Sequence, residues 1–390
     1  MDALMSSQPK ISIILPVYNA EKTLGRVVEC IRRQTLEDYE VISVDDGSTD
    51  NSFEIVKAVS DPRFQVYRQA NAGAGAARNK GTEQASGKYI FYCDADDYFE
   101  DNLLQVCFDE AEDTRADIVV FDFVREYVGE VRERVPGINR KLLPGQSRVF
   151  DRSSCPERIL SVLYPSPWCK LYRASFIREF QLKFDEIAVS NDISFSAVGA
   201  CLAEKITYIE NPLYTHRIGH EGTITTRKSR ELGDIAKAVQ STGEQIEKMG
   251  YAIELAASYR YFAVDQYIAN LYKFGDLSSP VTEAYYNEIR KAFLSHNPGN
   301  VDRDLLSDDR LYDRFTAVLQ NEFSSFKNIV LRDEISGIDV KRIEQKIKNQ
   351  LSYRIGQVIL QNVHPFYRIF AIPFLLYRAY REFRKHRDDG

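Results

Sequence analysis

The sequence has a single tryptophan, no CxxC pair among its six cysteines and no apolar run of about 20 residues. Without such a run we expect no transmembrane helix. Scattered cysteines exclude a cysteine-zinc site and a disulfide-stapled fold. No charged-then-apolar leader precedes the first strand-like run at Ile11, so we expect a reduced, cytoplasmic setting.

Basic residues are scarce over most of the chain. Residues 1–340 hold 40 Lys and Arg against 53 Asp and Glu, a net charge of −13, which argues against nucleic-acid binding. Residues 341–390 hold 11 basic against 4 acidic residues, a net charge of +7. Such a basic tail suits an anionic membrane surface or a docking partner. A length of 390 residues, 44% of them hydrophobic, predicts a globular protein of two or three domains.

The first hundred residues alternate between strand and helix patterns. Apolar runs of strand type at 11–15, 40–44, 64–67 and 88–93 are separated by helical patterns at 23–33, 51–59 and 75–85. This spacing predicts βαβ units and an open, mostly parallel α/β sheet with helices on both faces. Ligands of such sheets bind at the carboxyl ends of the strands.

The rest of the chain changes from mixed to helical. A helix to about residue 112 and a strand at 117–123 precede a charged, Gly- and Pro-containing stretch at 128–150, interpreted as a surface excursion or hairpin. From about residue 231 the pattern is helical, with segments at 235–249, 253–272, 281–293 and 312–326. We predict an α/β sheet domain at 1–228, a helical domain at 229–363 and an amphipathic basic tail at 364–390.

Two clusters follow the first two strands. Pro16, Val17, Tyr18 and Asn19 follow the first apolar run, where Tyr18 offers a face for a nucleobase, although the tetrapeptide taken alone favours a simple strand-to-helix turn. The second strand ends in Asp45 and Asp46, carboxylates that are costly to bury unless they accept hydrogen bonds from a base or a ribose. Capping of the next helix accounts for Ser48 and Asp50, but less well for Asp45.

Two further clusters follow the third and fourth strands. The small-residue loop Gly73-x-Gly75-x-x-Arg78 lacks a third small residue and follows the wrong strand for a dinucleotide fingerprint. Arg78 therefore faces a nucleotide or lies along a helix face. The strand at 89–93 ends in Asp94, Asp96 and Asp97, hard oxygen ligands that suit Mg²⁺ or Mn²⁺ on a diphosphate, or else form a solvated acidic turn.

Together these clusters, in this order and spacing, closely resemble the family-2 glycosyltransferases, whose nucleotide-sugar domain has the GT-A fold. The resemblance is dense over residues 11–110 and continues more weakly, through the segments at 168–172, 184–186 and 191–192, to about residue 225. It implies an inverting transfer of a sugar from a nucleotide-diphosphate donor, most often a UDP-sugar.

The resemblance also assigns roles to residues. Asp94 and Asp96 would hold a Mn²⁺ or Mg²⁺ ion that offsets charge on the leaving diphosphate. Tyr18 and Asp45 would hold the base, and Asp94 would also approach the ribose. The donor site would comprise Pro16, Tyr18, Asn19, Asp45, Asp46, Arg78, Asp94, Ala95 and Lys170.

An inverting displacement also needs a carboxylate that takes the proton of the acceptor hydroxyl. Asp192 is the first candidate, in a pair that reads Asn191-Asp192 where many relatives have Glu-Asp. Asp185 and Glu186 are the alternatives if the alignment shifts. An N-cap of the helix predicted at 193–202 is the structural alternative for Asp192.

Two histidines, His216 and His220, flank Arg217 in a region that folds over the diphosphate in several relatives. Either could complete the metal shell, and either could instead be polar surface.

The apolar and aromatic run at 366–377 has twelve residues, too few to cross a bilayer, and five basic residues follow it. This composition predicts an interfacial segment at the inner face of the membrane, and a lipid-linked saccharide acceptor of surface-polysaccharide synthesis would explain it. The alternatives are the buried face of a terminal helix and an oligomer contact. The basic residues are Arg378, Arg381, Arg384, Lys385 and Arg387.

Two other functions also place carboxylates after an apolar strand. Aspartyl-phosphate phosphatases share Asp94-x-Asp96, but they expect Thr or Val at the position of Tyr98 and do not explain the other clusters. A non-catalytic nucleotide-sugar-binding module is the second alternative, and it would not need Asp96 and Asp192 in metal and base roles.

Overall fold

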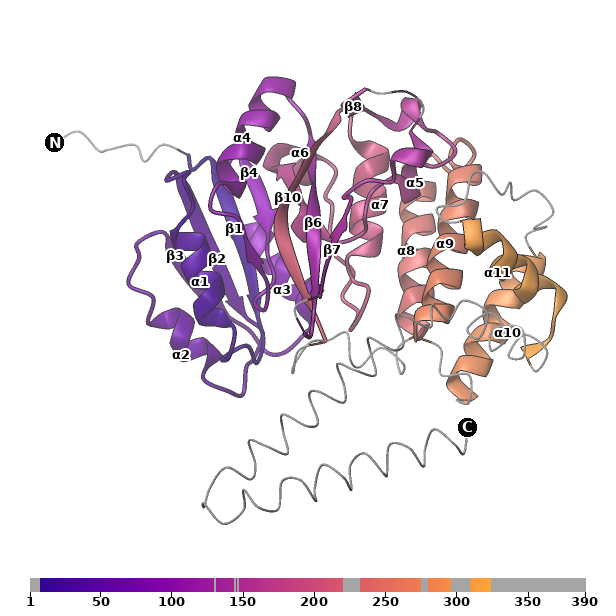
Figure 1. Ribbon diagram of the computed structural model, residues 1–390, viewed down its shortest axis with the longest axis horizontal. Helices are drawn as coiled ribbons and strands as arrows, with labels where there is room; N and C mark the ends of the chain where they lie inside the picture. The colour runs from indigo at the N-terminus through magenta and orange to yellow at the C-terminus, as the bar shows by residue number, and fades with distance from the viewer. Residues whose placement is uncertain are drawn as a thin grey trace, which may run out of the picture. The chain divides into compact units, whose positions relative to one another are not determined.

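The computed structural model divides the chain into two compact units, Met1–Phe323 and Ser324–Gly390. It describes residues 8–219, apart from residues 130, 144 and 146, and residues 232–274, 280–295 and 309–323. All described residues belong to the first unit, and Figure 1 shows its strands and helices in chain order.

The first half of the sheet is parallel, as the alternating pattern predicts. Strand β1 lies between β2 and β4, and β3 pairs with β2, all in parallel. Every residue of β1 and β2 is buried because helices cover both faces of this part of the sheet. The elements are β1 Ile11–Val17, α1 Leu24–Arg32, β2 Tyr39–Asp45, α2 Ser52–Lys57, β3 Phe64–Arg68, α3 Ala74–Gln84 and β4 Tyr89–Tyr92.

The second half of the sheet is mixed. The strand order is β3-β2-β1-β4-β9-β6-β10-β5, and β9 runs antiparallel to both of its neighbours, β4 and β6. Strand β7 pairs with β6 as an antiparallel hairpin, which confirms the hairpin alternative for the stretch after residue 128. The strands are β5 Tyr98–Phe99, β6 Ile118–Tyr127, β7 Val131–Val135, β8 Val149–Phe150, β9 Lys170–Arg173 and β10 Ile206–Ile218.

Helices and short 3₁₀ turns connect these strands. Helix α4 leads from β5 to β6, α6 follows β9, and α7 lies immediately before β10. The elements are α4 Leu103–Thr114, η1 Arg140–Leu142, η2 Arg152–Ser154, α5 Ile159–Val162, η3 Pro167–Cys169, α6 Ala174–Glu179 and α7 Ile193–Leu202.

Two hydrophobic clusters occupy the two faces of the sheet. Alternate residues of a strand point to opposite faces, so Ile13 and Leu15 join the cluster with α1 and α4, whereas Ile14 joins the cluster with α3 and α7. The same alternation separates Phe91 from Tyr92 on β4. The strands are therefore held rigidly where their carboxyl ends emerge.

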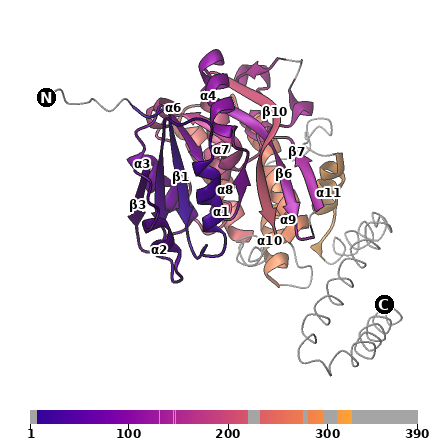
Figure 2. The ribbon, with the colours of Figure 1, turned by 60° about the vertical axis from the view of Figure 1, so that its left-hand side comes forward.

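The helical part extends the second of these clusters. Ala238 and Val239 of α8 pack in the same cluster as Phe195 of α7, and Figure 2 shows α7 and α8 near each other in the turned view. Its elements are α8 Leu232–Lys248, α9 Ala256–Phe274, α10 Pro280–Ser295 and α11 Asp309–Gln320. The predicted boundary at 228 and the tail at 364–390 lie outside the described residues, so the domain limits stay predictions. None of the described helices is long and apolar enough to cross a membrane.

Candidate active site

The ends of parallel strands bring the first, second and fourth clusters to one edge of the sheet. Val17 at the end of β1 is in register with Asp45 at the end of β2, and Asp94 follows β4 on the other side of β1. Pro16 pairs with Val44 inside the sheet, so it shapes the end of the strand from within.

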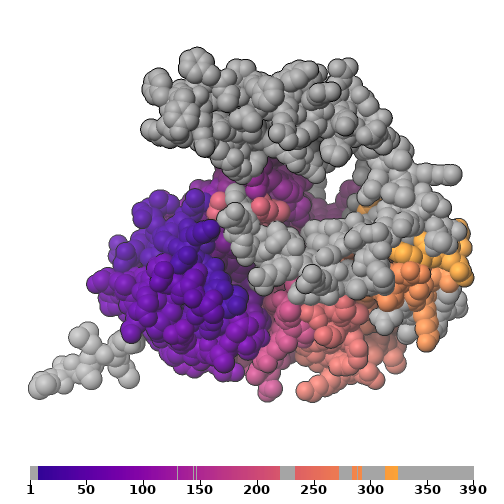
Figure 3. All heavy atoms as spheres, turned by 90° about the horizontal axis from the view of Figure 1, so that it is seen from below, coloured from indigo at the N-terminus to yellow at the C-terminus, as the bar shows by residue number. Residues whose placement is uncertain are grey.

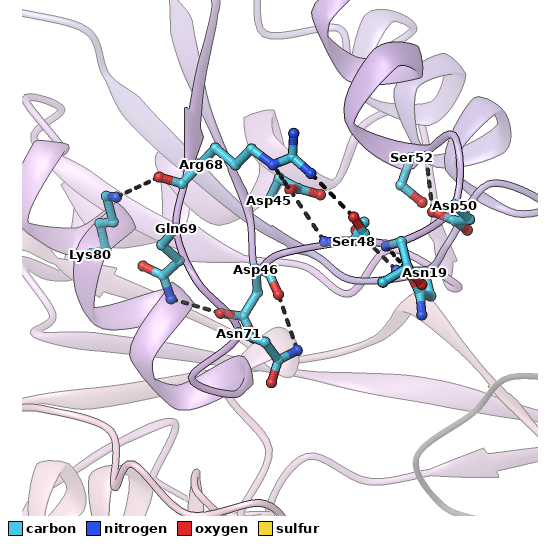
Figure 4. A network of polar contacts seen from close by, with 11 residues as sticks. Asn19, Asp45, Asp46, Ser48, Asp50, Ser52, Arg68, Gln69, Asn71 and Lys80 are labelled. Atoms are coloured by element: carbon cyan, nitrogen blue, oxygen red, sulfur yellow. Dashed lines mark hydrogen bonds and ion pairs between the residues drawn. The ribbon is translucent and has the colours of Figure 1, made fainter.

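Asn19 joins the first cluster to the second. Its backbone has a φ of +48°, and its Oδ1 accepts a hydrogen bond from the Thr49 amide at 2.8 Å. Its own amide donates to Ser48 Oγ at 3.1 Å, as part of the network in Figure 4. Tyr18, the preceding residue, is 44% exposed, so its ring is accessible for stacking.

Asp45 is buried and only partly satisfied by the protein. Its Oδ2 pairs with Arg68 Nε at 3.1 Å and accepts from the Ser48 amide at 3.3 Å. Its Oδ1 is buried with no hydrogen-bond partner in the described part of the chain. An unpaired buried acceptor costs free energy, so this oxygen is suited to a donor group on a ligand.

Asp46 differs from its neighbour because protein donors occupy both of its carboxylate oxygens. Oδ1 accepts from Gln69 Nε2 at 2.8 Å (Figure 4). Oδ1 also accepts from the Ala72 amide, and Oδ2 accepts from the Gly73 amide at 2.8 Å. Gly47 has a φ of +72°, and a Cβ there would lie 2.8 Å from the Asn71 amide nitrogen. Asp46 thus positions the small-residue loop.

Arg78 is a buried bridge between two parts of the site. It donates to Asp94 Oδ1 at 2.6 Å and to Asn191 Oδ1 at 2.8 Å, and it lies over the ring of Phe184. Burial lowers the pKa of Arg78, but the charges of Asp94 and Asp192 together raise it by more, so the net shift is upward. The guanidinium therefore stays charged, and it is not a surface side chain on a helix face.

The acidic residues after β4 have separate surroundings. Asp97 is buried and accepts from the Tyr214 hydroxyl at 2.9 Å and the Arg217 amide at 2.8 Å. The Asp96 carboxylate makes neither a hydrogen bond nor an ion pair with another described residue. Burial, and then the charges of Asp97 and Asp94, raise the pKa of Asp96 to about 7. These carboxylates do not form a simple solvated turn.

His216 faces this acidic turn from β10. Its Nδ1 lies 3.2 Å from Asp97 Oδ2, and its ring stacks on Trp168 with centroids 5.0 Å apart. Burial lowers the pKa of His216, but Asp97 and the other carboxylates raise it, with a net upward shift. A carboxylate at Nδ1 leaves Nε2 for another partner. His220 lies outside the described residues.

Of the three candidate bases, Asp192 combines partial burial with a carboxylate that has no partner among the described residues. It precedes α7, but its side chain makes no capping hydrogen bond and no other hydrogen bond or ion pair with described residues. Asp185 instead accepts from the Ser194 and Ser241 hydroxyls at 2.6 and 2.7 Å, and Glu186 is exposed. A Cβ on Gly75 would lie 2.2 Å from the Asp185 carbonyl oxygen, so glycine permits this approach.

Lys170 and Ala95 are used inside the protein. The buried Lys170 Nζ donates to the carbonyls of Tyr164 and Ser166, and burial lowers the pKa of Lys170. The Ala95 carbonyl accepts from Thr23 Oγ1 at 2.7 Å, which fixes the acidic turn against α1. Both residues support the loops around the site.

Several contacts could not be found by reading motifs. The Asp97–His216 pair and the bond from the Asp94 amide to the Tyr214 hydroxyl join the turn after β4 to β10. The stacking of Trp168 on Tyr214 joins η3 to β10. Within the described ranges, no group of three or more His, Cys, Asp or Glu side chains forms a ready-made metal site. A cation here would therefore share its shell with a ligand or water.

Comparison with known proteins decides the family. The family model "Glycosyl transferase family 2" matches residues 12–180. The putative glycosyltransferase EpsH of Bacillus subtilis is 31% identical over 244 residues, which cover 60% of this chain and 68% of EpsH. The chain belongs to glycosyltransferase family 2. This enzyme class excludes the phosphatase and the non-catalytic module.

Other relatives of this family-2 glycosyltransferase extend the comparison. Glycosyltransferase GlyA of Streptococcus pneumoniae is 31% identical over 251 residues, covering 63% of this chain but 36% of GlyA. A crystal structure of S. aureus TarS in complex with UDP covers 80% of this chain and 90% of that chain, at 19% identity and a TM-score of 0.48. A second model, a domain of unknown function (DUF8374), matches residues 283–389.

Proposed function

We propose that this family-2 glycosyltransferase moves a sugar, with inversion, from a UDP-sugar to a saccharide acceptor with the help of a divalent cation. The observation that carries the proposal is the pair of carboxylates Asp96 and Asp192, next to the two residues to which the buried Arg78 donates, Asp94 and Asn191. Neither carboxylate has a hydrogen-bond or ion-pair partner in another residue of the described part of the chain. One suits the diphosphate end of a donor and the other suits the acceptor end.

The base of the donor would lie on the first two clusters. Tyr18 offers an accessible ring for stacking, and Asp45 Oδ1 is a buried acceptor without a partner among the residues that the structure describes. The N–H of a uracil would satisfy this oxygen. Asn19 and Asp46 would hold the surrounding loops in place, and Pro16 would shape the end of β1.

The transfer would begin at Asp192. Its carboxylate takes the proton of an acceptor hydroxyl while that oxygen attacks the anomeric carbon from the side opposite the diphosphate. The bond from the anomeric carbon to the donor phosphate oxygen breaks, and its electron pair leaves with the diphosphate. Arg78, held by Asp94 and Asn191, keeps the two ends of the site at a fixed separation.

The residues after β4 fit Mn²⁺ or Mg²⁺. Asp96 has no side-chain partner in another described residue, Asp94 is partly exposed close by in the chain, and Asp97 orients His216 through Nδ1. Such cations take few protein ligands and complete their shell with phosphate oxygens and water. When bound, the cation would offset the charge that develops on the leaving diphosphate.

The donor base can be tested by calorimetric titration of the wild-type protein with UDP-, GDP-, CMP- and dTDP-sugars, with and without Mn²⁺. We expect a metal-dependent preference for UDP-sugars. Asp45→Asn should weaken UDP binding about tenfold or more, because an amide can turn a donor toward the N–H of the base. Glu54→Gln, on the exposed part of α2, is the matched control. Binding of no nucleotide would contradict the proposal.

We also propose that the acceptor is lipid-linked, in surface-polysaccharide synthesis, and that the basic tail contacts the inner face of the membrane. About 1 kcal/mol per basic residue near an anionic leaflet makes the five basic residues after the run at 366–377 important for docking.

In the full chain, changing these five residues to Gln should abolish flotation with anionic vesicles at low salt. Wild type should float with anionic vesicles and remain unbound with neutral ones. Changes to Gln at five exposed basic residues of the described chain, Lys57, Arg115, Lys183, Lys205 and Lys248, provide the control. Equal flotation of the tail variant and wild type would contradict membrane docking by the tail.

A further inference from the structure

A cavity of about 660 Å³ lies where α9 meets the sheet part of the first unit, and no sequence motif accounts for it. Five segments form its walls: the end of β6, the segment that follows β7, the segment 160–165, the first turns of α7, and α9. The volume is in the range of small-ligand sites. In Figure 1, α7 and α9 lie on the same side of β6 and β7.

Helix α9 contributes one regular face to the cavity. Phe262, Asp265, Gln266, Ala269 and Asn270 line it, at positions i, i+3, i+4, i+7 and i+8 of the helix. This spacing puts all five side chains on one face. Figure 3 shows the helical part, salmon to orange, next to the sheet part, indigo to purple, seen from below.

Buried polar contacts fix α9 against the cavity wall. Arg158 and Asp265 form a buried ion pair at 2.7 Å, and the Leu160 amide donates to Ser258 Oγ at 3.1 Å. Breaking a buried pair leaves an uncompensated charge, so this wall resists movement. The cavity is therefore a built feature of the fold.

The cavity begins beside the proposed base. Ile193, the residue after Asp192, lines it together with Tyr164. Arg125 also lines it and donates to the Tyr164 hydroxyl at 3.2 Å. Burial raises the pKa of the Tyr164 hydroxyl, Arg125 opposes that shift, and Asp192 is close enough to add to it.

The lining combines apolar side chains and neutral hydrogen-bonding groups with four charged residues, Arg125, Arg140, Lys141 and Asp265. Leu160, Val162 and Phe262 supply apolar surface, whereas Asn139, Gln266 and Asn270 supply amides. Ser161 also lines the cavity, and its hydroxyl oxygen is buried without a hydrogen-bond partner among the described residues. Amides and hydroxyls match the hydroxyls of a sugar, and the apolar surface matches an aliphatic group.

We propose that this cavity is the acceptor site and that it takes a sugar joined to an apolar group. The proposal rests on the proposed function, because it uses Asp192 as the base that faces the acceptor hydroxyl. It adds that α9, a helix of the helical part, helps to determine which acceptor binds.

The test uses n-octyl glycosides of glucose, galactose and N-acetylglucosamine as probes, each below its critical micelle concentration, in calorimetric titrations of the full chain with UDP present. Wild type should bind at least one of them at least tenfold more tightly than the free sugar or 1-octanol. Ala269→Trp, at an exposed position lining the cavity, should weaken that binding at least tenfold. Ala256→Trp, exposed on the same helix but outside the cavity, should not change it.

UDP affinity, measured on each variant, separates this proposal from the proposed function. Ala269→Trp should keep the UDP affinity of wild type, which also shows that it folds. Unchanged glycoside binding in Ala269→Trp, or no glycoside binding by wild type that binds UDP, overturns the acceptor site. Failure of wild type to bind any nucleotide overturns the proposed function instead.

Discussion

Replacement of Asp192 by Asn should reduce sugar transfer by about 10²- to 10⁴-fold, the usual contribution of a general base, and leave UDP affinity unchanged. The amide cannot accept the proton of the acceptor hydroxyl, whereas the shape of the side chain is kept. Because the Asp192 side chain makes no capping bond to α7, the substitution removes no cap from that helix. Initial rates of UDP release with acceptor present, together with UDP titrations, measure both effects.

Asp185→Asn is the matched control for this prediction. Its carboxylate accepts from the Ser194 and Ser241 hydroxyls, and an amide oxygen can keep one of these bonds. We expect transfer within about tenfold of wild type, with a lower unfolding midpoint. The assignment of Asp192 as the base would be wrong if Asp185→Asn lost transfer and Asp192→Asn retained it.

The parallel half of the fold could be predicted because each of its strands carries its own signal. Residues 11–15 and 40–44 are short apolar runs, each followed by a helical period. Strand β9 has no such signal. It has four residues, starts with a lysine, and becomes a strand because it fits between β4 and β6, which come from distant parts of the chain. Pairing of this kind is a tertiary effect that local pattern does not contain.

The sequence predicts where the candidate site lies more accurately than it predicts what each residue of the site does. The rule that ligands bind at the carboxyl ends of parallel strands places Tyr18, Asp45 and Asp94 at one edge of the sheet. It does not separate Asp45 from Asp46. Successive side chains leave a strand in opposite directions, and the turn after β2 directs Asp46 into the small-residue loop.

The same limit applies to the acidic turn. The sequence presents Asp94, Asp96 and Asp97 as equivalent carboxylates, but their partners come from other elements. Asp97 is satisfied by residues of β10, Asp94 pairs with Arg78, and only Asp96 is left without a partner among the described residues. The order of the strands therefore assigns the roles.

Arg78 connects the acidic turn after β4 with the segment that holds Asp192. A single buried cation contacts Asp94 on the donor side and Asn191 beside the proposed base. The amide of Asn191 accepts this hydrogen bond without adding a negative charge next to Asp192. Asp192 is therefore the one carboxylate of the pair Asn191-Asp192.

Asp96→Asn should remove the increase in UDP affinity that Mn²⁺ causes, and it should reduce transfer by about 10²-fold or more, because the cation supplies several kcal/mol of charge stabilisation. Without metal the variant should bind UDP at least as well as wild type. Loss of one carboxylate charge beside Asp94 and Asp97 lowers repulsion toward the diphosphate. UDP titrations in Mn²⁺ and in a chelator give the two affinities for each protein.

Asp101→Asn is the control, because Asp101 is an acidic residue near the same turn whose exposed side chain pairs with Arg33. It should keep both the metal response and the transfer rate of wild type. A full Mn²⁺ response in Asp96→Asn would contradict the role of Asp96. We expect Asp96→Asn to lose the metal response, and Asp192→Asn to lose transfer but keep UDP binding. These two results together would separate the donor end of the site from the acceptor end.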